Sequence, residues 1–175
     1  MANMYLVCGV SGSGKTTLSK MLEEKTGIKR LGVDDFYAMV NGDECRHVNK
    51  FEVWIEYFKA IHEMEEMNQD VIIDTNALTY SQRVQFVDWF PTFKHHMIFL
   101  CADHNLRKKN NKSRRRQIPD DILDNMALRV EMPTAKSDKE WDTITYIMND
   151  DNHFQEPMLV KGEINILQAI KELTK

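Results

Sequence analysis

The sequence has few cysteines and no long apolar run. Its 175 residues include three cysteines (Cys8, Cys45 and Cys101), and none shows CxxC or metal-ligand spacing, which argues against a disulfide framework and a zinc site. The longest apolar runs, such as residues 97–102, are far too short to span a bilayer. The chain starts on a strand pattern without a basic segment or cleavage site, which argues against a secretory signal. We therefore expect a cytoplasmic protein in a reducing compartment, with no membrane partner.

Acidic residues outnumber basic ones, yet the basic ones concentrate in one place. The formal net charge is −4, which by itself argues mildly against a nucleic-acid partner. Residues 107–116, called here the basic segment, contain no acid. A solvated helix face and a phosphate-binding surface would both give this pattern. The basic residues of the segment are Arg107, Lys108, Lys109, Lys112, Arg114, Arg115 and Arg116.

Apolar runs alternate with amphipathic segments along the chain. The apolar runs predict strands at residues 4–8, 29–33, 70–74, 96–102 and 143–148. The amphipathic segments predict helices at residues 16–25, 51–68, 81–90, 120–130 and 163–173, with a further helix from His104. This alternation predicts a single α/β domain over residues 1–175, in which a five-stranded parallel sheet is flanked by helices on both faces.

The longest predicted helix, at about residues 51–68, carries an apolar stripe. An aromatic and methionine stripe at helical spacing is typical of a surface that faces the core and not of a cofactor site. We therefore expect these side chains to pack in the core. They are Phe51, Trp54, Ile55, Phe58, Ile61 and Met64.

Residues 9–16 read GVSGSGKT and match the pattern GxxxxGK[ST]. Its glycines let backbone N–H groups point at phosphate oxygens, and the following helix adds the positive end of its dipole. The pattern lies between a predicted strand and a predicted helix, as a phosphate-binding loop requires. A glycine-rich turn without a ligand is the alternative. The residues expected to hold ATP are Gly9, Ser11, Gly12, Ser13, Gly14, Lys15, Thr16 and Thr17.

A bound triphosphate assigns further roles. Lys15 is expected to reach the β and γ oxygens, and the Thr16 hydroxyl is expected to bind Mg²⁺ directly. Asp74 closes the apolar run VIID, and a carboxylate at a strand end beside such a loop holds the water shell of the metal. A helix cap or turn is the alternative role for Asp74. ATP and Mg²⁺ are therefore the predicted cofactors.

Several stretches together resemble the kinase domain of the bacteriophage polynucleotide 5′-hydroxyl kinase family. They are GVSGSGKTT, VDDFY about two dozen residues later, VIIDTN, and the basic segment followed by IPDDIL. The resemblance runs from residue 4 to about residue 133. It implies a P-loop kinase fold with a basic lid at about residues 107–119, and transfer of the γ-phosphate of ATP to the 5′-hydroxyl of DNA or RNA.

The resemblance also implies catalytic residues. Asp34, the first acid of the DD pair, is implied as the general base, and transfer to an alcohol does need a proton acceptor. A helix cap with a first-turn acid is the alternative for Asp34 and Asp35. Arg114, and then Arg116, are implied as the lid arginines that neutralise charge on the triphosphate. Lys109 stands where the family has an arginine.

At two positions the sequence does not decide which acceptor receives the phosphate. Tyr37 replaces a family arginine that lies near the acceptor phosphate, which predicts altered recognition of the acceptor backbone. Arg83, which the family shares, either faces the metal–phosphate site or pairs on its own helix. A kinase for a small-molecule hydroxyl acceptor, such as a nucleoside or a sugar, is the alternative function, because the fold alone does not separate the two. The intact Asp34 and the basic lid disfavour a nucleotide-sensing module without catalysis.

Overall fold

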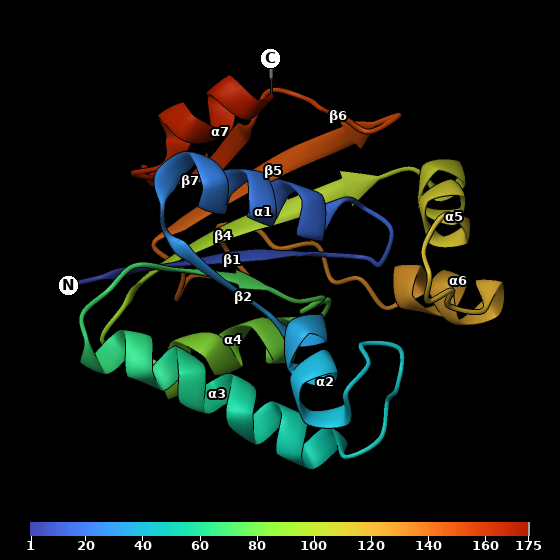
Figure 1. Ribbon diagram of the computed structural model, residues 1–175. Coiled ribbons are helices and arrows are strands. Elements are labelled where there is room, and N and C mark those ends of the chain that lie inside the picture. Colours follow the sequence, from blue (N-terminus) through green and yellow to red (C-terminus); the bar gives the residue numbers. More distant parts are fainter. Residues whose placement is uncertain (175) are drawn as a thin grey trace.

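The computed structural model describes residues 1–174 as a sheet covered by helices on both faces (Figure 1). Its five parallel strands confirm the predicted α/β fold. In sheet order they are β2 (Lys29–Gly32), β3 (Val71–Asp74), β1 (Asn3–Gly9), β4 (Lys94–Ala102) and β5 (Thr143–Asp150). No helix of the described residues is long and apolar enough to cross a membrane.

Two further strands bring the sheet to seven within residues 1–174. The short strands β6 (His153–Phe154) and β7 (Met158–Lys161) both pair antiparallel with β5, and the sequence analysis missed both. A two-residue turn joins β5 to β6, with φ of 44° at Asp151 and 68° at Asn152. Positive φ at both central residues is the geometry of a tight hairpin turn, which aspartate and asparagine tolerate well.

The helices divide between the two faces and the carboxyl edge of the sheet (Figure 1). Alternate residues of β1 feed separate cores, with Leu6 in one and Tyr5 in the other, because successive strand side chains point to opposite faces. Helices α1 (Lys15–Thr26) and α7 (Leu167–Leu173) cover one face, and α3 (Lys50–Glu66) and α4 (Tyr80–Trp89) cover the other. The remaining helices are α2 (Val33–Asn41), α5 (His104–Lys112) and α6 (Asp120–Leu128).

The buried face of α3 differs from the predicted stripe. Ile61 and Met64 are buried as expected, but Phe51 is 81% exposed and Ile55 is 37% exposed. The core face instead includes Tyr57, whose ring packs against neighbouring aromatic rings and whose hydroxyl donates to the Leu31 carbonyl at 3.5 Å. Trp54 and Phe58 of the predicted stripe pack against this core and are half-buried.

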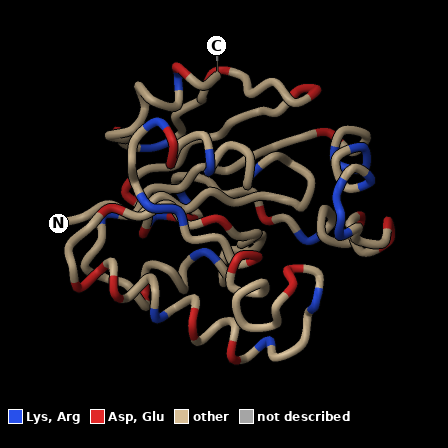
Figure 2. Tube along the Cα trace, viewed as in Figure 1, with Lys and Arg blue, Asp and Glu red and all other residues tan. Residues whose placement is uncertain are grey.

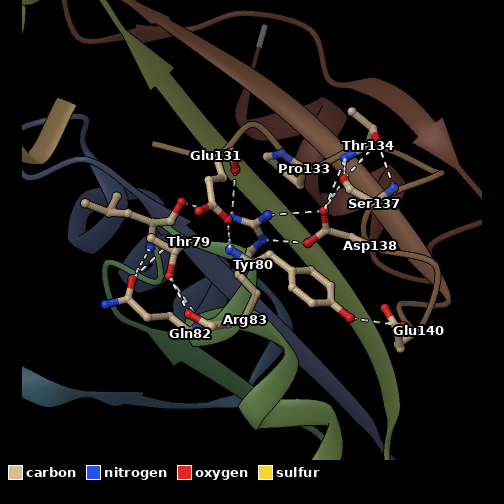
Figure 3. Close-up of polar contacts among 12 residues, drawn as sticks. Thr79, Tyr80, Gln82, Arg83, Glu131, Pro133, Thr134, Ser137, Asp138 and Glu140 are labelled. Atoms are coloured by element: carbon tan, nitrogen blue, oxygen red, sulfur yellow. Dashed lines mark hydrogen bonds and ion pairs between the residues drawn. The ribbon is translucent and has the colours of Figure 1, made fainter. Parts of the chain in front are cut away.

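Arg83 is fully buried in a set of satisfied hydrogen bonds (Figure 3). Its Nε and Nη2 donate to the two carboxylate oxygens of Asp138 at 2.6 and 3.1 Å. Its Nη1 donates to the carbonyls of Leu78 and Glu131 at 3.0 and 2.9 Å. Both sequence-based alternatives for Arg83 are therefore wrong, because its partners lie neither at a phosphate site nor on α4. The side chain ties α4 to the segment that follows α6.

Replacing Arg83 with methionine should destabilise the fold, because Asp138 would keep a buried charge without a partner. The expected loss in the free energy of unfolding is about 3–5 kcal/mol, measured by urea titration. Arg129, which is exposed at the end of α6, supplies the control: Arg129→Met should stay within about 0.5 kcal/mol of wild type. Similar losses in the two variants would contradict a structural role for the buried pair.

Candidate active site

The phosphate-binding loop joins β1 to α1 at the carboxyl edge of the sheet. The Gly9 N–H donates to the carbonyl of Asn76, which follows β3, at 3.0 Å. Gly12 has a φ of +85°, and a Cβ there would lie 2.6 Å from the Arg107 carbonyl oxygen of α5. A side chain at residue 12 would therefore clash as well as strain the backbone. The loop is held between the β3–α4 connection and α5.

Lys15 begins α1 from a buried position. It is 6% exposed, and its Nζ donates to the carbonyl of Val10 at 3.0 Å. Burial lowers the pKa of Lys15 to about 8, against the opposing effect of Asp74 and with a further lowering by Arg114. A phosphate anion would restore the charged form, because an opposite charge nearby favours it.

A cavity of about 510 Å³ opens beside this loop. Its volume falls within the range of small-molecule sites. The lining contains one group of charged and hydroxyl side chains and one group of aromatic side chains. The phosphate side is lined by Ser11, Lys15, Thr16, Asp34, Asp74, Arg114 and Arg116. The aromatic wall, as we call it, consists of Trp54 and Phe58 of α3 with Phe86 and Trp89 of α4.

The other residues expected to hold ATP shape the loop or lie beside it. Gly14 has a φ of +98° and stands at the N-cap of α1. Ser13 is buried, and its hydroxyl has no hydrogen-bond partner among the described residues. The Ser11 hydroxyl lies 3.4 Å from the Asn76 amide oxygen. Thr17 is exposed on α1.

The two aspartates of the DD pair serve different partners. Neither is the cap of α2, because Gly32 occupies the cap position. Asp34 lines the cavity, and its Oδ1 lies 3.5 Å from Nη1 of Arg116. Asp35 instead accepts from Arg30 at 2.6 Å. Only Asp34 therefore faces the space in which a hydroxyl could approach a phosphate.

Asp74 is 5% exposed and keeps one oxygen for a ligand. Its Oδ2 accepts from the Ser19 hydroxyl at 3.2 Å and from Arg30 at 2.9 Å. The Oδ1 atom makes no hydrogen bond within residues 1–174. The cap alternative for Asp74 is wrong, because Thr79 caps α4. The Thr16 hydroxyl and a free carboxylate oxygen fit the oxygen ligands that Mg²⁺ prefers.

The basic segment divides into cavity-lining and paired residues. Arg114 and Arg116 line the cavity, and Arg107 is buried next to the phosphate-binding loop. Lysines and arginines gather along α5 and the loop after it (Figure 2), but acids offset several of them. Ion pairs join Lys108 to Asp124, Lys109 to Asp151 and Arg115 to Asp43. Lys109 therefore pairs with the β5–β6 turn.

Asn111 fastens the loop that carries the arginines. It is 2% exposed, its Nδ2 donates to the Ile118 carbonyl at 2.6 Å, and its Oδ1 accepts from the Ile118 N–H at 2.9 Å. These two bonds close residues 113–117, here called the arginine loop. The Asn111 side chain therefore holds the two ends of the arginine loop together.

The sequence did not predict the contact between Tyr37 and His47. The rings of Tyr37 and His47 stack with centroids 3.8 Å apart at 21°, and both line the cavity. Burial, helped by Arg116, lowers the pKa of His47, which favours a neutral ring in the stack. Arg30 was missed too, because nothing in the sequence of β2 signals its contact with Asp74.

Comparison with known proteins decides the family. Residues 4–133 match the family described as an AAA domain. The chain belongs to the AAA domain family. A curated relative of this AAA domain is Protein kti12 of Schizosaccharomyces pombe, 23% identical over 167 residues that cover 85% of this chain and 58% of the relative. The chain therefore spans only 58% of that protein's length.

Several solved structures share the fold of this chain. A gluconokinase from Sinorhizobium meliloti 1021 superposes with a TM-score of 0.59 at 16% identity, over 99% of this chain and 91% of that one. Chaetomium thermophilum Kti12 with ADP-AlF3 gives 0.60 at 16%, over 85% and 90%. A chain of the Pnkp1/Rnl/Hen1 RNA repair complex gives 0.67 at 13%, over 94% and 50%. At these identities the likeness shows the fold alone, which is that of the P-loop kinases.

The lowered pKa of Lys15 predicts proton uptake when this AAA domain binds ATP. At pH 9 the free lysine is mostly neutral, since its pKa is about 8, and the triphosphate restores its charge. Uptake should approach about one proton at pH 9 and vanish below pH 7, where Lys15 is charged in both states. Calorimetry in two buffers of different ionisation enthalpy measures it. Lys15→Met should abolish the uptake and Lys20→Met, on an exposed residue of α1, should keep it; equal uptake in both would refute the assignment.

Proposed function

We propose that this protein is an ATP-dependent polynucleotide kinase that transfers the γ-phosphate of ATP to the 5′-hydroxyl of DNA or RNA. The observation that supports this most directly is that Lys15, Asp34 and Arg114 line one cavity. Phosphoryl transfer to an alcohol requires three parts. They are a group that binds the phosphates of the donor (Lys15), a group that accepts the hydroxyl proton (Asp34) and a cation for the transferred phosphate (Arg114). Small-molecule kinases such as gluconokinase and shikimate kinase share this fold, so only the lining of the cavity can distinguish the acceptor.

The residues divide the chemical step among themselves. The acceptor oxygen forms a bond to the γ-phosphorus as the bond from that phosphorus to the bridging oxygen breaks, and ADP leaves. Asp34 takes the hydroxyl proton, while Lys15 and Arg114 hold the phosphoryl oxygens. Thr16 and Asp74 would hold Mg²⁺, which supplies charge neutralisation on the phosphates when it is bound.

The cavity lining favours a nucleic-acid end over a sugar. A sugar or sugar acid offers no flat ring to the aromatic side chains of the lining, which are Trp54, Phe58, Phe86 and Trp89, whereas a nucleobase does. Arg116 lines the cavity 3.5 Å from Asp34 and would be the cation available to a backbone phosphate of the acceptor strand. A free nucleoside is the second candidate acceptor, because a cavity of about 510 Å³ is large enough to enclose one.

A panel of acceptors tests the proposal. The protein is incubated with ATP labelled at the γ-phosphate, Mg²⁺, and matched 5′-hydroxyl DNA and RNA oligonucleotides, nucleosides, gluconate and shikimate. The 5′-hydroxyl oligonucleotides should become labelled, whereas the same strands carrying a 5′-phosphate should not. Label that appears only in the nucleosides supports the second candidate. Label that appears only in a sugar or sugar acid refutes both.

Asp34→Asn should abolish most of this transfer and leave ATP binding nearly unchanged. A general base acts in the chemical step, so kcat should fall by about a hundredfold or more while the Kd for ATP moves little. Asp35→Asn is the matched control, because Asp35 is the adjacent carboxylate and pairs with Arg30. Its effect on kcat should be several-fold at most. A larger loss of kcat in Asp35→Asn than in Asp34→Asn would overturn the assignment.

Neighbouring arginines provide a second matched pair. Arg114 lines the cavity and lies close enough to lower the pKa of Lys15, whereas Arg115 pairs with Asp43. A cation on the transferring phosphate acts mainly in the transition state, so Arg114→Ala should lower kcat by about ten- to a thousandfold. Arg115→Ala should change kcat by less than about threefold, since exposed ion pairs contribute little. Steady-state kinetics at saturating ATP separates the two, and equal kcat values would show that Arg114 has no role in transfer.

A further inference from the structure

We propose that the aromatic wall binds the nucleobase of the acceptor's first nucleoside, so that a planar heterocycle selects the acceptor. This inference rests on the proposed kinase activity and assigns its acceptor subsite. It concerns side chains of α3 that the sequence pattern placed in the core. The occupant it requires is a purine or pyrimidine attached to the sugar whose 5′-hydroxyl faces Asp34.

The wall is a connected set of rings from two helices. Phe58 is at its centre, with its ring centroid 5.4 Å from that of Trp54 and 4.8 Å from that of Trp89. The Phe58 and Trp89 rings are perpendicular, at 89°, and Phe86 closes the set 6.4 Å from Phe58. All four rings line the cavity, Phe86 from a buried position, and stacked or edge-on contacts are the favoured geometries between aromatic rings.

The wall is also incompletely covered. Trp89 is 51% exposed, and Trp54 and Phe58 are only half-buried. Large aromatic surface left open in a concave site marks a place where a ligand completes the packing. Phe51 precedes Trp54 by one helical turn on α3 and is 81% exposed, but it does not line the cavity. It therefore provides a control on the same helix.

Amide side chains accompany the rings. Gln82 and Gln85 of α4 both line the cavity. The Gln82 Oε1 accepts from the Leu78 and Thr79 N–H groups, and its Nε2 makes no hydrogen bond within residues 1–174. Amides offer both donors and acceptors, and these are the groups that read the edge of a base. A plain hydrocarbon ligand would leave them unused.

The side of the cavity near Asp34 supports the same acceptor. Tyr37, 6% exposed and stacked on His47, shares the lining with Asp34. Neither ring supplies the fixed positive charge that an arginine would offer to a phosphate. Recognition beside the base is therefore aromatic, and one arginine, Arg116, remains next to Asp34 for a backbone phosphate. Base stacking on aromatic side chains tolerates any base, so the subsite would require a base without requiring a sequence.

The first test changes only the acceptor and uses the wild-type protein. Two 5′-hydroxyl oligonucleotides are compared that differ in the first residue, which is a normal nucleotide in one and an abasic sugar in the other. Removal of the base should raise the acceptor KM by about ten- to a hundredfold, with the KM for ATP unchanged. Equal acceptor KM values for the two strands would overturn the inference and leave the kinase assignment standing.

The second test changes the wall. Trp89→Ala should raise the acceptor KM for the normal strand by a similar factor but should leave its KM for the abasic strand nearly unchanged. Phe51→Ala should behave as wild type on both strands. A Trp89→Ala variant that raises KM equally for both strands has lost something other than a base contact, and that result would also overturn the inference.

A binding measurement separates this inference from the proposed polynucleotide activity. A 5′-hydroxyl oligonucleotide with 2-aminopurine as its first base should lose fluorescence on binding, because stacking on the wall quenches it, and Trp89→Ala should reduce that quenching. If only free nucleosides are phosphorylated, and Trp89→Ala raises their KM, the polynucleotide proposal fails and the base subsite is supported. No quenching, together with no dependence of KM on Trp89, refutes the base subsite whatever the acceptor.

Discussion

The site depends on the parallel pairing of β1 with β3. Their register places Val7 opposite Asp74, so the strand that leads into the phosphate-binding loop ends beside the strand that ends in the carboxylate. The absence of a side chain at Gly9 is part of this constraint, since a Cβ there would lie 2.4 Å from the Leu100 carbonyl oxygen of β4. The backbone can therefore pass between two neighbouring strands and still turn into α1. Lys15 and Thr16 at the start of α1, and Asp74 at the end of β3, are positioned from that edge.

Local sequence patterns predicted those parts of the structure that depend on neighbouring residues. The strand–loop–helix unit and the order of strands and helices follow from apolar runs and glycines, and the comparisons confirm this fold. The sequence patterns did not predict which residues pair with the buried charged side chains. Arg30 reaches Asp74 from the next strand of the sheet, and Arg83 reaches Asp138 across 55 residues. Such contacts depend on tertiary geometry, which no spacing in one sequence encodes.

The error in the buried face of α3 and the failure to predict β6 have different physical causes. The helical period of α3 was right, but a period does not say which side of a helix faces the sheet when aromatic residues lie all around it. Tyr57 was the better core residue because its ring packs inward while its hydroxyl still meets a carbonyl. The β5–β6 turn did have a signal, since Asp151 and Asn152 are residue types that accept positive φ. The same pattern would have identified the extra strand.

Two hydrogen bonds join Asn111 to Ile118. Because of them, the entropy cost of ordering residues 113–117 arises during folding and not during ligand binding. Fixing the backbone of one residue costs about 1–2 kcal/mol in conformational entropy, so five loose residues at 113–117 would take roughly 5–10 kcal/mol from each binding event. Here the constraint is part of the fold, because the Asn111 side chain holds the ends of the arginine loop together. Under the proposed activity, a nucleotide would then leave by breaking side-chain contacts to its phosphates, without disordering residues 113–117.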